Sequence, residues 1–501
     1  PMKGNLPTKE PLIQKKWEDE NLYKSLLNLN KNSKKFILHD GPPYANGDIH
    51  IGHAVNKILK DIILRSKILS GFYTPFVPGW DCHGLPIELE VEKKLNKKEN
   101  ISDKDFRNLC REYAIKQVDR QKKDFKRLGI LGDWENPYLT LDKEFEASTI
   151  KSLEKIYNNG HLKKGFKPVN WCVKIQSALA EAEVEYKEKE STSIDVKFKI
   201  TSLENIEKIF NIKNINLDTS VVIWTTTPWT LPSNKSVAIK KDFNYILISD
   251  QKENYIISEN LLESFKDRVA LDLQIIATCS GEKLINLEAQ HPFLNNTINI
   301  IDSNHVTDDS GTGCVHIAPA HGVEDFELGI KHNLEVVNPI QSNGVFSGYP
   351  KEFNGIHVYK LDEYVIDLLQ RENKLLSKNK FRHSYPHCWR TKTPLIYRAT
   401  PQWFVSMNKN GLLGSTLGKV SEVNWLPAWG EARIQGMLSG RPDWCISRQR
   451  KWGVPITMLI NKKTGEPHSN TSIIFSRVSK LVEQYGIEKW FDIKIEDLID
   501  N

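Results

Sequence analysis

The sequence lacks the marks of secreted and membrane proteins. Its seven cysteines are scattered, without the paired spacing of a disulfide framework, which favours a reducing compartment. No apolar run approaches the roughly 20 residues that a membrane-spanning helix needs. No charged segment followed by an apolar one begins the chain, as a signal peptide would. There is also no internal repeat and no low-complexity segment. These absences predict a cytoplasmic protein that has no membrane partner.

Length and charge set further limits. The 501 residues are too many for one core of ordinary size, so we expect two or three domains. The chain is 39% hydrophobic and 26% charged, which is typical of a globular protein. Its net charge of +6 allows a polyanionic partner without requiring one. Because it begins at Pro1 and stops in KIEDLIDN, we expect a fragment of a longer protein.

Local patterns predict helix-rich segments on both sides of a β-rich block. Residues 36–40, FILHD, are an apolar run that ends at Gly-Pro-Pro, which predicts a buried strand and a loop. The next segment places apolar residues three and four apart with lysines opposite, which predicts an amphipathic helix ending at Gly71. Strand, loop and helix are the first half of a βαβ unit. Short runs between about 185 and 380, such as TSIDVKFKI and GCVHIAP, predict an inserted β-rich domain.

Two histidines, His50 and His53, lie at the entrance of the predicted helix, within GPPYANGDIHIGH. A metal site is one interpretation, but no HExxH pattern and no carboxylate or cysteine at helical spacing accompanies them. A second interpretation is a pair of histidines that cap the helix. A third is phosphate binding, because a helix N-terminus offers N–H groups to an anion and imidazole donors stabilise developing charge. Gly41, Gly47 and Gly52 would let a nucleotide approach the backbone closely.

The stretch GPPYANGDIHIGH is similar to the signature of class I aminoacyl-tRNA synthetases, and PGWDCHGLPIE (78–88) resembles their isoleucine-specific members. Nucleotidylyltransferases share an HxGH element, so only the flanking residues distinguish the synthetases from them. The resemblance implies an α/β fold in which a Rossmann-like parallel sheet is interrupted by a β-rich editing domain. It also implies ATP with Mg²⁺ as substrate, and His50 and His53 as the catalytic residues that stabilise the α-phosphate in the transition state.

The resemblance further assigns the two substrates. It implies that ATP is bound by Gly41, Pro42, His50, Gly52 and His53, and the amino acid by Pro42, Asp81 and Trp452. The case for Asp81 is also physical, because a buried amino-acid ammonium needs a paired carboxylate. The alternative for Asp81 is a cap on the helix that opens at LPIELEVEKK. Trp452 lies in RPDWCISRQRKWGVPI (441–456) and would form a wall of the isoleucine pocket.

Two stretches of the β-rich block indicate a second, hydrolytic site. VVIWTTTPWTLPSN (221–234) and GTGCVHIAPAHGVEDF (311–326) are similar to the editing motifs of the isoleucine, valine and leucine enzymes. Editing is needed because an apolar pocket discriminates one methylene by only about 1–3 kcal/mol, isoleucine against valine in this enzyme class being the standard example. The resemblance implies that Thr225, Thr226 and Thr227 line the pocket, that His316 lies beside the substrate and that Asp325 pairs with its ammonium. Threonines alone would indicate only a β-branched strand end.

Two family features are missing from this chain. The isoleucine members often carry zinc in the stem of the insertion, held by two Cys-x-x-Cys pairs. Here Ile175 stands where the cysteine that pairs with Cys172 would be, and Thr391 where the partner of Cys388 would be. The two remaining thiolates cannot close a tetrahedral site. We therefore expect no metal in this chain, and zinc in the longer protein only beyond residue 501. A KMSKS-type loop, the second ATP signature, is also expected only beyond residue 501.

The predicted domains are an N-terminal extension with the first half of the catalytic domain (1–180), the inserted editing domain (181–385) and the return to the catalytic domain (386–501). By resemblance, the longer protein is a monomer that ligates L-isoleucine to tRNA(Ile) through isoleucyl-adenylate and hydrolyses mischarged valyl-tRNA(Ile). The fragment is expected to retain at most the hydrolysis. The valine enzyme, a stand-alone aminoacyl-tRNA deacylase and a small-molecule nucleotidylyltransferase remain alternatives, and GWDCHGLP argues against the first.

Overall fold

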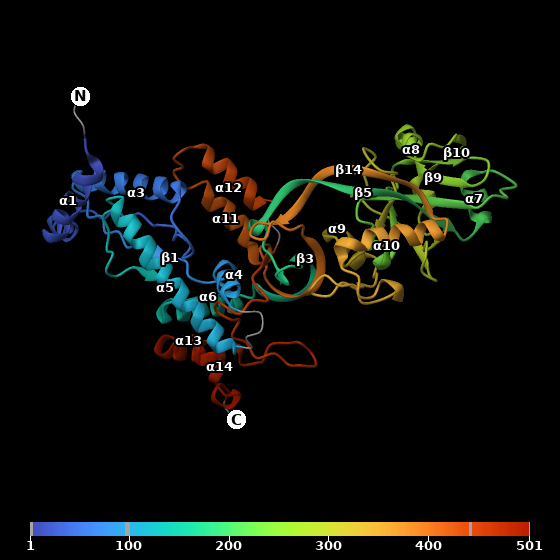
Figure 1. The fold of residues 1–501 in the computed structure, drawn as a ribbon. Helices are drawn as coiled ribbons and strands as arrows, with labels where there is room; N and C mark the ends of the chain where they lie inside the picture. Colours follow the sequence, from blue (N-terminus) through green and yellow to red (C-terminus); the bar gives the residue numbers. More distant parts are fainter. Residues whose placement is uncertain (1–3, 96–100, 440–442, 500–501) are drawn as a thin grey trace. The chain divides into compact units, whose positions relative to one another are not determined.

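A computed structural model describes residues 4–95, 101–439 and 443–499. The chain divides into two compact units (Figure 1). Unit 1 consists of Pro1–His161 together with Arg450–Asn501, and unit 2 of Leu162–Gln449. Unit 2 is therefore inserted, in sequence, between two segments of unit 1.

Unit 1 is mainly helical. Its helices are α1 (Leu6–Asp19), α2 (Leu22–Leu29), α3 (Ile51–Leu69), α4 (Leu85–Lys94), α5 (Asp103–Arg127), α6 (Lys143–Asn158), α13 (Thr471–Tyr485) and α14 (Lys489–Asp492), followed by the 3₁₀ turn η7 (Ile495–Asp497). The strands β1 (Gly79–Trp80) and β2 (Tyr138–Leu139) pair in parallel. Single parallel bridges join Lys35 to Tyr73 and Tyr44 to Asp81. The pairing described within residues 4–161 is thus parallel, as predicted for a Rossmann-like sheet.

The predicted buried strand at residues 36–40 is wrong. Phe36 N donates to Tyr73 O at 2.9 Å, but no strand continues from it. Ile37 is 61% exposed, and the fully buried side chain of the segment is Asp40. The segment leaves the sheet because Asp40 turns inward to form ion pairs with Lys57 and Lys60 of α3.

Helix α3 has the predicted extent, but it buries the opposite face from the one that an amphipathic helix ordinarily buries. Its buried residues are Lys57, Asp61 and Leu64. Asp40 neutralises Lys57 and Lys60, so the lysine side of the helix can face the interior. The apolar side chains on the other side are exposed: Ile51, Val55, Ile58, Leu59, Ile62 and Ile63.

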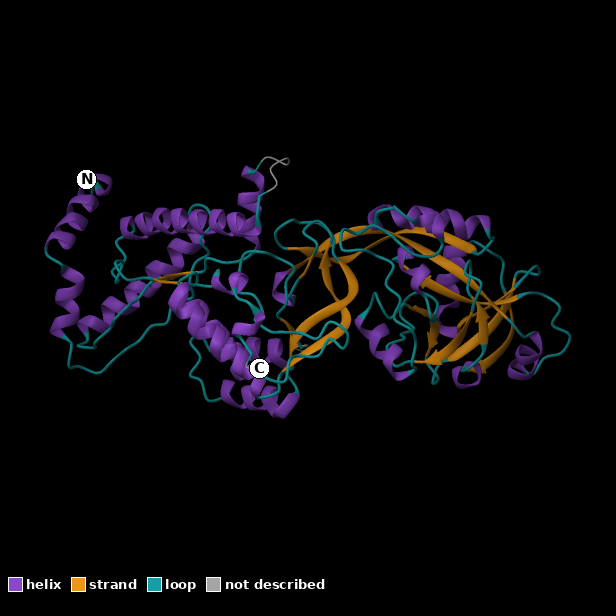
Figure 2. Cartoon of the chain, turned by 90° about the horizontal axis from the view of Figure 1, so that it is seen from below, coloured by secondary structure: helices purple, strands orange, loops and turns teal. Residues whose placement is uncertain are grey.

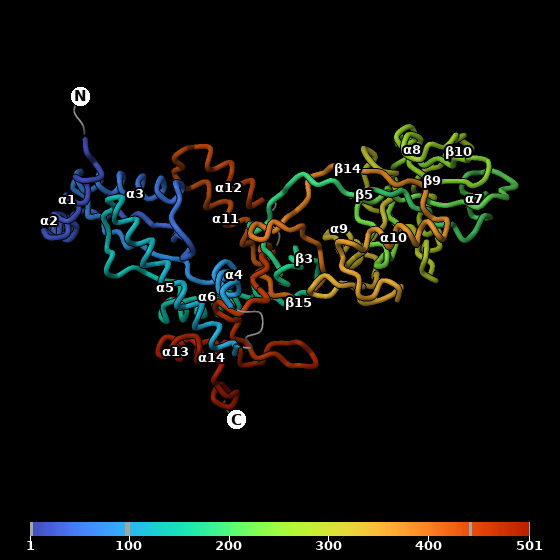
Figure 3. The backbone as a smooth tube through the Cα atoms, viewed as in Figure 1, coloured from blue at the N-terminus to red at the C-terminus, as the bar shows by residue number. Residues whose placement is uncertain are grey.

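Aromatic side chains form the centre of unit 1. The ring of Trp80 lies 6.3 Å from that of Phe125 and 6.2 Å from that of Trp134. Helix α5 supplies buried side chains three and four residues apart, which is why it runs through the middle of this core: Phe106, Cys110, Ala114, Val118, Gln121 and Phe125. Helix α13 packs against α6, and the tube in Figure 3 follows the return of the chain to this unit.

Unit 2 contains two sheets, shown as strands in Figure 2. The smaller is antiparallel, with the order β16 (Trp444–Cys445), β15 (Ile396–Val405), β3 (Leu162–Cys172) and β4 (Ser177–Ala178). The larger has the order β10 (Gln274–Ser280), β8 (Asn244–Ser249), β9 (Asn254–Ser258), β6 (Thr219–Thr225), β5 (Val184–Ile200), β11 (Glu288–Gln290), β12 (Thr297–Asp302), β7 (Ser236–Ile239) and β13 (Val315–Ile317). A further long strand, β14 (Leu375–Cys388), pairs antiparallel with β5.

Helices and 3₁₀ turns complete unit 2. The helices are α7 (Leu203–Phe210), α8 (Leu262–Val269), α9 (Val323–Lys331), α10 (Val358–Arg371), α11 (Leu412–Val420) and α12 (Trp429–Ser439). The 3₁₀ turns are η1 (Glu181–Glu183), η2 (Pro228–Ser233), η3 (Glu259–Leu261), η4 (Gly281–Leu284), η5 (Lys351–Phe353) and η6 (Lys409–Gly411). The β-rich texture predicted for residues 185–380 is present.

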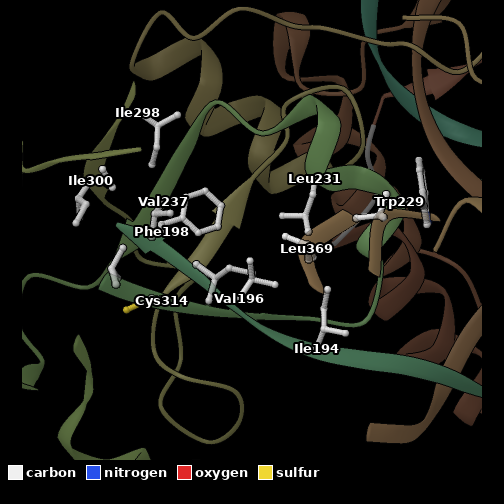
Figure 4. Close-up of a cluster of buried hydrophobic side chains, with 14 of the residues drawn as sticks. Ile194, Val196, Phe198, Trp229, Leu231, Val237, Ile298, Ile300, Cys314 and Leu369 are labelled. Atoms are coloured by element: carbon white, nitrogen blue, oxygen red, sulfur yellow. The ribbon is translucent and has the colours of Figure 1, made fainter. Parts of the chain in front are cut away.

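The core of unit 2 follows from the alternation of side chains along β5. Ile194, Val196 and Phe198 are fully buried on one face of this strand. Figure 4 shows them together with Leu231 of η2 and Val237 of β7. This packing fixes η2, which directly follows the threonine motif, against the sheet. No helix in the described ranges is both long and apolar enough to cross a membrane.

We predict that Asp40→Asn destabilises unit 1 by about 3–5 kcal/mol, because it leaves the buried Lys57 ammonium with no opposite charge. Lys57→Met should cost less, since Lys60 still pairs with Asp40. Urea unfolding followed by tryptophan fluorescence compares the two variants. A loss below about 1 kcal/mol for Asp40→Asn, the size expected of an exposed pair, would contradict a structural role for this carboxylate.

Candidate functional site

His50 and His53 form the N-terminal cap of α3. His50 Nδ1 accepts a hydrogen bond from Gly52 N at 3.1 Å, and His53 Nδ1 accepts one from His50 N at 3.3 Å. The two rings stack with their centroids 3.9 Å apart. Because each Nδ1 is an acceptor, the proton of each neutral ring lies on Nε2. Each ring therefore offers an Nε2–H donor.

Neither histidine ring is turned into a packed interior. His50 is exposed and His53 is half-buried. Burial, His50 and Lys57 all lower the pKa of His53, so this ring is neutral at physiological pH. A Cβ on Gly52 would lie 2.9 Å from Cε1 of His50, so a side chain there would displace the cap. Capping uses Nδ1 and phosphate binding would use Nε2, so these two interpretations are compatible.

Two glutamines that the sequence analysis missed hold the loop before α3. Gln121 Nε2 donates to Tyr44 O and Gly47 O, both at 3.0 Å, and Gly47 N donates to Gln117 Oε1 at 3.1 Å. Gly47 has φ +79°, a conformation that favours glycine. Gly41 has open space where a side chain would stand, and it is exposed, whereas Pro42 is half-buried. No local pattern links Gln117 and Gln121 to a loop 70 residues earlier.

Asp81 is joined to this loop through its backbone. Asp81 N donates to Pro43 O at 2.9 Å, and Ala45 N donates to Asp81 O at 2.8 Å. Burial raises the pKa of the Asp81 carboxyl, and in the part of the chain that the structure describes no lysine or arginine forms an ion pair with it. The alternative of a helix cap is wrong, because Gly84 is the N-cap residue of α4 and no side chain caps that helix.

Trp452 is buried beneath the segment that carries Asp81. Its Nε1 donates to Cys82 O at 2.7 Å, and its carbonyl accepts from Gly84 N at 3.1 Å. Its ring lies 4.9 Å from that of His83. The structure thus places Trp452 against the residues that follow Asp81. Its role as a wall of the amino-acid pocket stays a prediction.

A cavity of about 910 Å³ lies elsewhere in unit 1. It is lined by α1, α2, the C-terminal end of α5 and residues 129–135. None of the predicted site residues borders it, and its acidic and basic side chains are nearly balanced in number, so we assign it no role in the predicted chemistry.

In unit 2, hydrogen bonds connect the threonine motif to the histidine of the second motif. Thr227 N donates to Thr225 Oγ1 at 3.1 Å, and the two hydroxyls lie 3.3 Å apart. Thr230 Oγ1 donates to Thr227 O at 2.8 Å and lies 3.0 Å from His316 Nε2. The structure thus brings Thr225, Thr227 and His316 together. Thr226, which lies between the other two threonines in the sequence, is half-buried.

One ring nitrogen of His316 has no hydrogen-bond partner among the described residues. Because the Thr230 hydroxyl donates its hydrogen to Thr227 O, it accepts from Nε2–H of His316. The other nitrogen, Nδ1, is then an acceptor, and it is buried without a hydrogen-bond partner. Burial lowers the pKa of His316 to about 4, so the ring is neutral at physiological pH.

Asp325 lies in the first turn of α9. Its Oδ2 accepts from Ala318 N at 2.9 Å, which places the carboxyl next to the strand β13 that carries His316. Burial, with a smaller contribution from the neighbouring Glu324, raises the pKa of Asp325 to about 7. A buried carboxyl of this kind gains most from a cationic ligand.

Three more residues support this site and were missed in the sequence. Thr230 and Asn234 belong to the threonine-rich stretch, and Asn234 Oδ1 is buried without a partner. Asp362 of α10 accepts from Trp229 N at 2.9 Å and so anchors the start of η2. Burial raises the pKa of Asp362 to about 6. Membership of a quoted motif could have identified the first two, whereas Asp362 has no local signal.

The residues at the stem of the insertion do not fit zinc. Cys172 Sγ lies 3.5 Å from Thr391 Oγ1 and 3.6 Å from Thr393 Oγ1, and Thr391 N donates to Cys388 Sγ at 3.5 Å. Two sulfurs and two neutral hydroxyls are not the ligand set of a structural zinc. Within residues 4–95, 101–439 and 443–499, no three His, Cys, Asp or Glu side chains are arranged to hold a metal ion.

A family profile described as tRNA synthetases class I (I, L, M and V) matches residues 12–501. The chain belongs to the class I tRNA synthetases. An isoleucine–tRNA ligase of Francisella tularensis subsp. novicida (strain U112) is 54% identical over 493 residues, which are 98% of this chain and 53% of the relative. The corresponding ligase of subsp. mediasiatica (strain FSC147) is 55% identical over the same shares. This class I chain spans about half the length of the curated relatives it matches.

Solved structures give weaker likenesses to this class I chain. The Agrobacterium radiobacter K84 agnB2 LeuRS, in a ternary complex with tRNA and LeuAMS, is 17% identical over 93% of this chain and 52% of that chain, with a TM-score of 0.37. The structure titled GlLeuRS-CP1 is 16% identical over 37% of this chain and 98% of that chain, with a TM-score of 0.32. These scores are too low to support an argument.

We predict that Asp325→Asn stabilises unit 2 at pH 8. The folded-state pKa of Asp325 lies above its usual 3.8, so the folded state holds the proton more tightly and stability falls as pH rises through about 7. A rise from 3.8 to about 7 corresponds to at most roughly 4 kcal/mol. Thermal unfolding at pH 8 and pH 4 should show a gain at pH 8 alone. An equal gain at both pH values would contradict the ionisation argument.

Proposed function

We propose that the full-length protein ligates L-isoleucine to tRNA(Ile), using ATP with Mg²⁺ to form isoleucyl-adenylate first. The observation that carries this proposal is the pair of Nε2–H donors on His50 and His53, at the N-terminus of a helix whose preceding loop is tied to Asp81. The isoleucine–tRNA ligase that is 54% identical over 98% of this chain supports the choice of isoleucine. We also propose a monomeric cytoplasmic protein.

In the proposed activation step, the carboxylate of isoleucine attacks the α-phosphate of ATP and pyrophosphate leaves. Negative charge grows on the α-phosphate oxygens, and the two imidazole donors and the positive end of α3 stabilise it. Gly41, Pro42 and Gly52 would border the nucleotide. Asp81 would pair with the substrate ammonium, which fits its raised pKa and the absence, among the described residues, of a lysine or arginine paired with it. Catalysis here depends on positioning and charge, with no covalent enzyme nucleophile.

We assign the editing reaction to unit 2, within the domain that we propose at residues 181–385. Asp325 would pair with the ammonium of a misattached valine, while Thr225, Thr226 and Thr227 border the terminal ribose. His316 Nδ1 would accept a hydrogen bond from the attacking water. Water adds to the ester carbonyl, the bond to the ribose oxygen breaks, and valine and free tRNA leave. The unpartnered Nδ1 supports this role, because a buried acceptor gains a full hydrogen bond from a bound water.

The first test is ATP–pyrophosphate exchange by the full-length protein. We expect a higher kcat/KM for isoleucine than for valine, and we expect His50→Ala and His53→Ala each to lower kcat by about 10²–10³-fold, as the loss of a preorganised donor does. Unchanged thermal unfolding of both variants would show that the fold is intact. A higher kcat/KM for valine would identify the valine enzyme, and full activity without either histidine would refute the catalytic assignment.

The second test is hydrolysis of valyl-tRNA(Ile) by the 501-residue chain. Asp325→Ala should lower kcat/KM at pH 7 by about 10- to 100-fold, because it removes a charge-assisted contact. Thr226→Pro should also lower it, because proline fixes φ and removes a backbone donor in the motif. Asp242→Ala, which removes an exposed carboxylate in the turn before β8, is the matched control. Full hydrolysis by Asp325→Ala would count against the editing site.

The pH profile of that hydrolysis provides a separate test. If Asp325 must be ionised to bind the ammonium, kcat/KM should fall as pH drops through about 7, the value to which burial raises its pKa. His316, with a pKa of about 4, cannot produce a limb there. The limb should disappear in Asp325→Asn, and its persistence would assign it to another group.

A further inference from the structure

An arginine that lies outside both editing motifs contacts the second of them. Arg268 of α8 forms a bidentate ion pair with Asp195 of β5: its Nε donates to Oδ2 at 3.0 Å and its Nη2 donates to Oδ1 at 2.9 Å. The same Nη2 donates to Gly311 O at 2.8 Å. Gly311 is the first residue of the second motif, GTGCVHIAPAHGVEDF. Helix α8 and strand β5 are labelled in Figure 1.

The position of Arg268 is set by Asp195. The Asp195 carboxyl is fully buried, on the face of β5 opposite to Ile194 and Val196. Ser377 of β14, which pairs with Asp195 across the ladder, donates to Oδ2 at 2.5 Å. A buried carboxylate without its cationic partner is strongly destabilising, so the guanidinium is held at this carboxyl. A donor of the guanidinium that points away from the carboxyl then reaches Gly311.

The turn 311–313 is fixed at each of its three carbonyls. The first accepts from Arg268, the second from Ser258 N at 2.8 Å, and the third from the hydroxyl of Tyr245 at 2.7 Å. The glycines at both ends of the turn have φ +77° and +71°, a conformation that other residues rarely adopt. The turn therefore has a defined position, and Arg268 is the charged residue among its three donors.

This turn lies against the start of the threonine motif. A Cβ on Gly311 would lie 3.3 Å from Cε3 of Trp224, so the backbone of the turn and the indole ring are in close contact. Trp224 directly precedes Thr225, and it pairs with Asp195 across the β5–β6 ladder. Asp195 thus belongs to the strand that is paired with the threonine motif, and Arg268 joins it to the turn that begins the second motif.

We propose that Arg268, oriented by Asp195, is a positioning residue of the proposed editing site. It holds the turn 311–313 against Trp224 and thereby sets the separation between the threonine motif and β13, the strand that carries His316. The inference rests on the proposed hydrolysis of valyl-tRNA(Ile), in which one motif borders the ribose and the other holds the attacking water. A misplacement of about 1 Å between such groups can cost about 100-fold in rate.

The competing interpretation is an ion pair that only stabilises the fold. The shape of the guanidinium distinguishes the two interpretations. A lysine at position 268 still neutralises Asp195, but its ammonium is a point charge that cannot hold two carboxylate oxygens and a carbonyl in fixed directions. If only neutralisation matters, Arg268→Lys keeps both stability and hydrolysis. If the geometry matters, Arg268→Lys keeps the fold and loses rate.

The test measures kcat and KM for the hydrolysis of valyl-tRNA(Ile) by the 501-residue chain, and the Tm of each variant. Arg268→Lys is the main variant. Gly311→Ala is the second, because its Cβ presses on Trp224 while the ion pair stays intact. It decides the outcome if Arg268→Lys fails to fold.

Lys197→Met is the matched control. Lys197 lies two residues beyond Asp195 on the same face of β5, and its Nζ pairs with Glu253 Oε2 at 2.5 Å. Glu253 precedes β9, at the opposite end of that strand from Ser258. The control therefore removes a comparable ion pair from the same strand without removing a contact of the turn 311–313.

We expect Arg268→Lys and Gly311→Ala each to lower kcat by about 10- to 100-fold with KM changed less than about threefold, and Lys197→Met to change neither by more than about threefold. This split marks an interaction that matters in the transition state rather than in binding. Full kcat in Arg268→Lys, a rise in KM alone, or an equal fall of kcat in Lys197→Met would each overturn the inference. If the unmodified chain does not hydrolyse valyl-tRNA(Ile), the proposed editing function fails and the inference fails with it. Hydrolysis by the unmodified chain with full kcat in both variants rejects the inference alone.

Discussion

The ion pairs of Asp40 with Lys57 and Lys60 determine how unit 1 is arranged. Asp40 ends the extended segment that precedes the loop, and the lysines lie one and two turns into α3, beyond His53. These ion pairs hold the two ends of the loop close together, because separating them would leave a buried charge unpaired at a cost of several kcal/mol. The same contacts fix the rotation of α3. They decide which way His50 and His53 face, and they turn the apolar side of the helix outward.

Both candidate sites contain imidazole rings whose tautomers are set by backbone or hydroxyl contacts. At the entrance of α3 the Nδ1 atoms of His50 and His53 accept from backbone N–H groups, which leaves Nε2–H as donor. In unit 2 Thr230 takes Nε2–H of His316, which leaves Nδ1 as acceptor. A donor suits growing charge on phosphate, and an acceptor suits a water that must lose a proton. In the proposed reactions the same residue type would thus serve opposite needs, because different neighbours occupy one of its nitrogens.

The sequence predicted features that depend on neighbouring residues. The extent of α3 and the β-rich texture of residues 185–380 follow from local patterns, and parallel pairing near the signature loop follows from the family resemblance. Features that depend on distant residues could not be read. The strand at 36–40 was wrong because a lysine 17 residues later turns Asp40 inward. Gln117, Gln121 and Asp362 act on loops far away in sequence. Periodicity located the apolar side of α3, but not the direction in which it faces.

The raised pKa of Asp325 bears on how an editing site could release its product. Without a ligand, burial favours the protonated form of this carboxyl, whose pKa is raised to about 7. An arriving ammonium favours the ionised form, so part of its binding free energy is spent in removing that proton. After hydrolysis the free amino acid has a carboxylate of its own, whose charge opposes that of Asp325. In the proposed reaction, ionisation of Asp325 would then become unfavourable again, the proton would return, and its contact with the ammonium would weaken. A carboxylate with an ordinary pKa would stay charged throughout, so its contact with the ammonium of the product would weaken less.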